Sequence, residues 1–133
     1  MRRIDDTDPG EIARGIAAFA RTPNGGLVVG TSASAIIHRE LIVALAAQQR
    51  LPAIYPLRVY VTGGGLISYG ADVIEPFHSA ADYINRILNG EKPSDLPVQA
   101  PTRYETILNM KTAKALGLQV PASILVRADE VIE

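Results

Sequence analysis

The fold of this chain is decided by its last third, which reads Ile87-Leu-Asn-Gly-Glu-Lys-Pro-Ser-Asp-Leu-Pro-Val-Gln99 and then Tyr104-Glu-Thr-Ile-Leu-Asn-Met-Lys-Thr-Ala-Lys-Ala-Leu-Gly-Leu118. Asn89-Gly90 predicts the end of a helix, because glycine supplies the left-handed conformation of a helix cap at little cost. Prolines keep the following segment extended: Pro93, Pro97 and Pro101. Tyr104–Asn109 then alternates as a strand does, and Lys111–Gly117 predicts a short helix. The order is therefore helix, extended crossover, strand and helix.

The first half of the chain predicts a helix, a strand and a second helix. Asp8-Pro9-Gly10-Glu11 has the cap residue, the early proline and the acidic first turn of a helix start. Leu27-Val28-Val29 is a continuous apolar run between glycines, which is typical of a buried parallel strand. One helix is expected from about Ala35 to Gln49, with these residues on its inward face: Ile36, Ile37, Leu41, Ala44 and Leu45.

Two more strands are expected at Pro52–Pro56 and Leu66–Tyr69, and a further helix from about Val73 to Leu88. Strands separated by helices of this length favour βαβ units with right-handed crossovers. The sequence therefore predicts an α/β fold, a three-layer αβα arrangement around a mainly parallel sheet. At 133 residues the chain is expected to form one domain, 1–133.

The composition excludes several classes of function. A net charge of −1 gives no electrostatic basis for binding nucleic acid, and the absence of cysteine excludes disulfides and cysteine-ligated metals. Arg2 and Arg3 are followed by acidic residues where a secretory signal needs an apolar run: Asp5, Asp6, Asp8 and Glu11. As written, the chain is expected to stay in the cytoplasm.

Five residues are candidates for contact with a ligand. Thr31 and Ser32 follow a predicted parallel strand, where hydroxyls and backbone N–H groups converge on ligands. Tyr55, Ser68 and Tyr69 lie at the ends of the next two strands and could stack on and orient a small organic solute. Helix capping by the Thr31–Ser34 loop and a purely peripheral place for the tyrosines are the alternatives.

The sequence gives no basis for catalysis. The two histidines, His38 and His78, lack the spacing of a helical metal site, and no Ser/His/Asp set has a recognisable local frame. We therefore expect no enzyme activity, no catalytic residue, no metal and no cofactor.

With Gly64-Gly-Leu-Ile-Ser-Tyr-Gly70 upstream, the last third resembles the C-terminal part of ABC transporter substrate-binding proteins. The group is the type I periplasmic-binding-protein-like one that includes binders of tryptophan and other aromatic solutes. The resemblance runs from about Glu11 to Glu133, and the N-terminal half of the family has no counterpart. It implies a second-lobe βαβ core over about 11–72, and a crossover helix, return strand and C-terminal helices over about 73–133.

The resemblance implies binding of a small organic solute without chemistry, such as an amino acid or a small carboxylate, as part of an uptake system. In the family, which is exported, two lobes close around the solute and dock on a membrane permease. The alternative is a stand-alone interaction or sensory module, or a gene remnant without transport activity. The resemblance also places the helix at 73–88 against the first lobe. Its apolar face would then be uncovered here, which predicts a homo-oligomer: Phe77, Ala81, Ile84 and Leu88.

Overall fold

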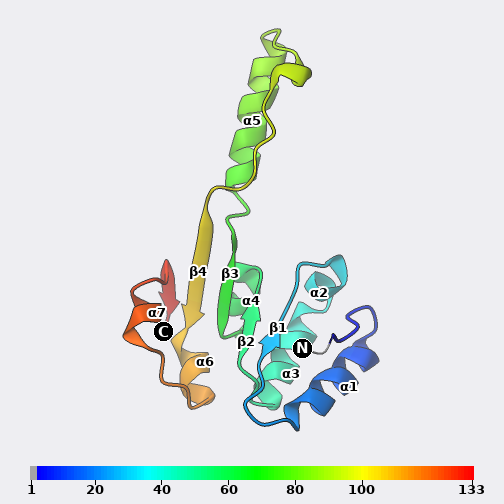
Figure 1. Ribbon diagram of the computed structural model, residues 1–133, viewed down its shortest axis with the longest axis vertical. Coiled ribbons are helices and arrows are strands. Elements are labelled where there is room, and N and C mark those ends of the chain that lie inside the picture. Colours follow the sequence, from blue (N-terminus) through cyan, green and yellow to red (C-terminus); the bar gives the residue numbers. More distant parts are fainter. Residues whose placement is uncertain (1–2) are drawn as a thin grey trace.

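A single five-stranded sheet organises the computed structural model, which describes residues 3–133 (Figure 1). The strands lie in the order β1-β2-β3-β4-β5, and all neighbours are parallel except β3 and β4. Their bounds are Leu27–Val28, Ala53–Tyr55, Ile67–Ala71, Tyr104–Asn109 and Glu130–Ile132. The predicted α/β fold with a mainly parallel sheet is confirmed.

Helices connect most of these strands. They are α1 Pro9–Ala20, α2 Ala33–Ile37, α3 Arg39–Gln48, α4 Arg58–Thr62, α5 Glu75–Leu88, the 3-10 turn η1 Pro93–Asp95, α6 Met110–Ala115 and α7 Ala122–Leu125. Sequence reasoning missed α4 and β5. Over residues 3–133, no helix has both the length and the apolarity needed to cross a membrane.

Helix α1 begins as its sequence predicts. The Asp8 carboxylate accepts a hydrogen bond from the Glu11 N–H at 2.9 Å, and Pro9 occupies the first turn, where its missing N–H costs nothing. Ile12 and Ile16, one turn apart, are both 2% exposed and face the core. These contacts fix α1 against α3 and the sheet.

The core lies on one face of the sheet. Ala53 and Tyr55 of β2 point into it and meet Tyr60 of α4, whose ring stacks on that of Tyr55 at 5.0 Å between centroids. A second, smaller cluster covers the opposite face at β3 and β4. There Ile67 and Leu108 pack against the segment from Met110 to Ala128. The two faces of the sheet are therefore covered unequally.

The apolar run at Leu27–Val28 predicted a strand buried on both faces, and this prediction is wrong. It forms the edge of the sheet, paired with β2 alone, and the Val28 side chain is 67% exposed. An apolar run predicts burial only when the strand has neighbours and covering helices on both sides. Within the described residues, β1 has one neighbouring strand and is covered by helices on one face.

The helix expected from Ala35 to Gln49 is interrupted at His38, whose backbone (φ −94°, ψ 16°) ends α2. The interruption shifts the helical phase, so the buried residues of α3 are Ile42, Val43 and Ala46. The expected inward face was wrong for three residues, since Ile36, Ile37 and Ala44 are exposed. Leu41 and Leu45 are half-buried and do pack on the core.

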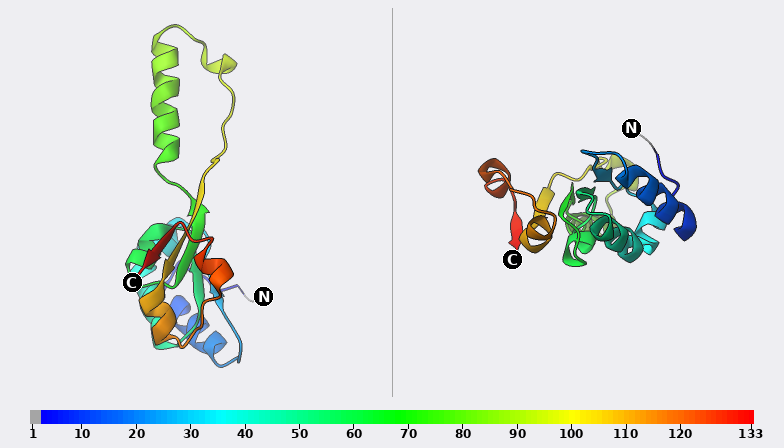
Figure 2. Two further views of the ribbon diagram at one scale, coloured as in Figure 1. Left: turned by 90° about the vertical axis from the view of Figure 1, so that its left-hand side faces the viewer. Right: turned by 90° about the horizontal axis from the view of Figure 1, so that it is seen from below.

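Helix α5 and the segment that returns from it project from the body as an arm (Figures 1 and 2). On one side the arm is held together by Tyr83, whose hydroxyl donates to the carbonyl of Pro97, and by the ion pair of Arg86 and Glu91. At its base the Glu75 carboxylate accepts hydrogen bonds from the Thr102 hydroxyl and the Arg103 N–H. Gly90 (φ +98°) ends the helix as predicted.

Candidate functional site at the carboxyl ends of the strands

The carboxyl ends of β1, β2 and β3 meet at the edge of the sheet from which the arm rises (Figure 1). Ligands of open parallel sheets bind at this edge, because loops and helix starts converge there. The loops border an open hollow of about 470 Å³ that we call the rim pocket. It is lined by Thr31, Pro56, Leu57, Tyr69, Gly70, Ala71, Asp72, Val73, Pro76 and Tyr104.

Two tyrosines form an aromatic wall of the rim pocket. Tyr69 of β3 and Tyr104 of β4 lie diagonally across the antiparallel pair, with their rings stacked at 5.7 Å between centroids and 21° between planes. Both remain about half exposed, at 57% and 51%. A flat solute can therefore contact this pair while its polar groups reach the loops.

One carboxylate, that of Asp72, lines the rim pocket at the base of the arm. The Asp72 side chain is 19% exposed, accepts a hydrogen bond from the Ile74 N–H at 2.8 Å, and lies 3.9 Å from Nε of Arg103. It gives the otherwise apolar rim pocket a negative group that suits an ammonium group of a solute. Sequence reasoning missed Asp72 and Tyr104. The signal for Asp72 was available, because it is the first charged residue after the third strand.

The predicted site residues are only partly brought together. Thr31 and Tyr69 both line the rim pocket. Ser32 instead caps α2: its hydroxyl accepts a hydrogen bond from the Ala35 N–H at 3.0 Å and donates to Asp6, so the capping interpretation of this residue is confirmed.

Tyr55 and Ser68 lie in the core, each 2% exposed, and neither lines the rim pocket. They face each other in the β2–β3 register, on the face that α4 covers. Burial raises the pKa of Tyr55 to about 12. Tyr55 precedes Pro56 and Ser68 precedes Tyr69, both of which line the rim pocket. Because side chains alternate along a strand, Tyr55 and Ser68 point to the opposite side, into the core.

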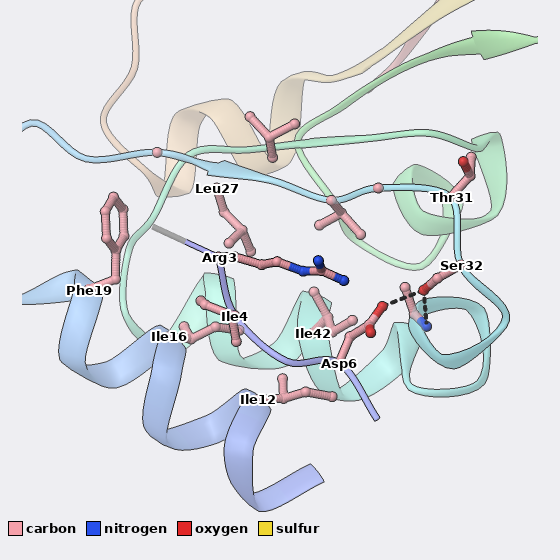
Figure 3. A pocket seen from close by; sticks show the side chains of 15 residues that line it. Arg3, Ile4, Asp6, Ile12, Ile16, Phe19, Leu27, Thr31, Ser32 and Ile42 are labelled. Atoms are coloured by element: carbon pink, nitrogen blue, oxygen red, sulfur yellow. Dashed lines mark hydrogen bonds between the residues drawn. The ribbon is translucent and has the colours of Figure 1, made fainter. Parts of the chain in front are cut away.

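A larger hollow of about 680 Å³, the edge pocket, lies between β1 and helices α1 and α3 (Figure 3). Its lining is mostly apolar and includes Ile12, Ile16 and Phe19, with Arg3 and Asp6 from the N-terminal segment. Two of the predicted site residues, Thr31 and Ser32, also line it. The Asp6 carboxylate is already bonded to Ser32. We place the candidate solute site in the smaller rim pocket, because only that hollow joins the ends of three strands to the arm.

A lobe of this kind, with an apolar pocket at the ends of its parallel strands, defines a class of ligand-binding α/β domain. The chain belongs to the ABC transporter substrate binding protein family, whose model matches residues 22–132. No curated protein sequence matches it with significance.

Several solved structures are similar to the chain. The ABC domain in complex with L-Trp from Streptococcus pneumonia has a TM-score of 0.81 and 25% identity, over 94% of this chain and 42% of that one. A conserved domain protein from Vibrio cholerae has a TM-score of 0.78 and 24% identity, over 93% and 42%.

A ligand-free, open substrate binding protein with adhesive properties from Clostridium difficile has a TM-score of 0.67 and 23% identity, over 94% and 41%. The chain therefore spans about two fifths of the length of these structures.

Proposed function

We propose that this chain binds a small organic solute in the rim pocket, without chemical conversion, as one lobe of the binding component of an ABC uptake system. The observation that carries the proposal is the Tyr69–Tyr104 ring pair beside Thr31 and Asp72, at the carboxyl ends of parallel strands. The L-Trp complex of the similar Streptococcus structure supports an aromatic amino acid as the first solute to test.

Each group has a distinct role in this proposal. The ring of Tyr69, supported from behind by Tyr104, stacks on the flat part of the solute. Asp72 attracts the ammonium group, and the Thr31 hydroxyl donates to or accepts from the polar end. A single lobe covers about half of a solute, so we expect weak affinity until a second lobe or subunit closes the pocket. Docking on a permease would require that a second lobe or subunit first close the pocket.

We also propose that the polypeptide forms a homo-oligomer, because α5 carries large apolar side chains that are mostly exposed: Phe77 at 77%, Ile84 at 57% and Leu88 at 81%. The exposed arm favours the second candidate function as well, an oligomeric interaction module without a solute. Light scattering at micromolar concentration tests the oligomer, and a monodisperse monomer contradicts it.

Titration with L-Trp tests the solute proposal. The chain contains no tryptophan, so the change in fluorescence of the added amino acid reports binding without a tryptophan signal from the protein. We expect Tyr69→Ala to weaken binding at least about tenfold, or ~1.4 kcal/mol, through loss of stacking and buried area. Thr62→Ala, at the exposed end of α4, is the matched control and leaves binding unchanged. Equal affinity in both variants would remove the rim pocket from the proposal.

A further inference from the structure

The base of the arm brings two segments of the chain together beside the rim pocket (Figure 1). One segment leaves the body after β3, and the other returns to it before β4. The Asp72 N–H donates to the carbonyl of Arg103 at 3.0 Å, and the Arg103 N–H donates to the Glu75 carboxylate at 3.1 Å. These bonds use only the backbone of Arg103. They therefore hold Arg103 opposite Asp72 and leave its side chain free for another role.

The side chains of Asp72 and Arg103 form an open ion pair. Oδ2 of Asp72 lies 3.9 Å from Nε of Arg103, which is beyond hydrogen-bond distance. The Asp72 carboxylate is fixed by the Ile74 N–H at 2.8 Å, whereas the Arg103 side chain is 67% exposed. Exposed ion pairs contribute little to stability. The arm is therefore held by its backbone hydrogen bonds, and this pair is available for a solute.

A second arginine near the rim pocket is already engaged. Arg58 follows the lining residue Leu57, but its guanidinium is bound to both carboxylate oxygens of Glu130, at 2.5 and 2.8 Å. Bidentate pairs of this kind are strong and orient the planar guanidinium. Within residues 3–133 the guanidinium of Arg103 donates no hydrogen bond, and Arg103 directly precedes Tyr104 of the aromatic wall. Arg103 can therefore turn toward a solute without breaking a hydrogen bond.

An open pair of opposite charges favours a solute that carries both charges. A solute with only an ammonium group is attracted by Asp72 and repelled by Arg103, and a solute with only a carboxylate meets the reverse. A zwitterion is attracted by both, because its ammonium group can lie beside Asp72 and its carboxylate beside Arg103. The other residues that line the rim pocket are uncharged, so charge selection there depends on this pair.

We propose that Arg103 is a specificity-determining residue of the rim pocket, which binds the carboxylate of an amino-acid zwitterion while Asp72 binds its ammonium group. This inference rests on the solute-binding function proposed above and adds to it a residue that flanks the pocket lining. The planar guanidinium offers paired N–H donors that match the two oxygens of a carboxylate. The flat part of the solute then lies on the ring of Tyr69.

Three indole compounds separate the two charges. L-Trp carries both, tryptamine lacks the carboxylate, and 3-indolepropionate lacks the ammonium group. Titrations followed by indole fluorescence should show that the wild-type chain binds L-Trp at least about tenfold more tightly than either analogue. Arg103→Gln should weaken L-Trp binding at least about tenfold and leave tryptamine binding undiminished, because attraction and repulsion are removed together. Asp72→Asn should weaken the binding of L-Trp and tryptamine but not that of 3-indolepropionate.

Two further variants serve as controls. Arg21→Gln removes an exposed arginine that follows α1 and precedes β1, and therefore lies toward the amino ends of the strands, away from the rim pocket. It should leave the affinity for all three indoles unchanged. Arg103→Lys keeps the charge but loses the paired donors, and its affinity for L-Trp should fall between those of wild type and Arg103→Gln.

The pattern over the three compounds distinguishes a solute contact from a purely structural role. If Arg103→Gln weakens the binding of all three indoles equally, Arg103 is structural and the inference is wrong. An L-Trp affinity that Arg103→Gln leaves unchanged also overturns it. In that case, weakening of L-Trp binding by Tyr69→Ala would preserve the solute proposal without Arg103. If the wild-type chain binds none of the three compounds, both proposals fail.

Discussion

Replacing Gly70 with alanine tests whether β3 must pass directly beneath the loop that follows β2. A Cβ atom at Gly70 would overlap the carbonyl oxygen of Pro56 and lie 3.0 Å from its carbonyl carbon. The obstacle is backbone, which cannot rotate away as a side chain can. Overpacking of this kind costs typically about 1–3 kcal/mol, and we expect about 3 kcal/mol or more here. That is a large part of the roughly 5–15 kcal/mol by which domains are stable.

Urea unfolding followed by circular dichroism measures this loss, with Gly30→Ala as the matched control. A Cβ atom at Gly30 meets nothing within 4 Å, so its replacement should change the free energy of unfolding by less than about 0.5 kcal/mol. Gly70 also lines the rim pocket, and the displaced loop should weaken solute binding. If Gly70→Ala proves as stable as Gly30→Ala, the close approach of β3 to Pro56 is refuted.

Three further predictions concern polar groups. In the described chain the buried Tyr60 hydroxyl has no hydrogen-bond partner, so Tyr60→Phe should raise the free energy of unfolding by about 1 kcal/mol; a loss in urea unfolding contradicts this. The pKa of Tyr55 near 12 means that the unfolded chain loses this proton first. The contribution of Tyr55 to stability should therefore be complete below about pH 10 and fall by roughly 3 kcal/mol between about pH 10 and pH 12. Tyr55→Phe should remove this part of the decrease and leave the part due to Tyr60, whose pKa burial also raises. The hydrogen bond from the Thr102 hydroxyl lowers the pKa of Glu75. The hydrogen bonds that the Glu75 carboxylate accepts from Thr102 and Arg103 therefore stabilise the arm above the ordinary glutamate pKa, and are lost as the pH falls through the lowered pKa of Glu75. Amide exchange at Arg103 should accelerate there in wild type, whereas in Glu75→Gln it should lack that transition.

The elements that the sequence predicted well are those with strong local signals. Asp8 and Pro9 mark the start of α1, Gly90 marks the end of α5, and the alternation over Tyr104–Asn109 matches β4. Each of these features depends on residues that are close together in the chain. The apolar stripe of α5 was also predictable, since its spacing is a property of the helix alone.

The missed elements depend on contacts between distant residues. Strand β5 has three residues and exists because it pairs with β4, more than 20 residues earlier. Helix α4 has five residues, too few to show a period. Neither length nor composition separates such elements from a loop.

The candidate site shows the same limit at the level of single side chains. Thr31 and Tyr69, which the predicted strand ends suggested, line the rim pocket. The sequence could not show which of two adjacent residues at a strand end points outward. Tyr55 and Ser68 point inward because α4 covers their face, and α4 was not predicted. Asp72 and Tyr104 join the pocket because β4 returns beside β3, a long-range pairing.

The central claim is that the rim pocket binds a solute, and titration with L-Trp followed by nuclear magnetic resonance tests it most directly. Changes in the amide chemical shifts identify which residues lie near the bound L-Trp. The account predicts that shifts concentrate at Leu57, Tyr69, Asp72 and Tyr104, which line the rim pocket alone, and that Ile16 in the edge pocket stays unchanged. Shifts confined to the edge pocket, or none at saturating L-Trp and with other amino acids, would contradict a solute site at the ends of these strands.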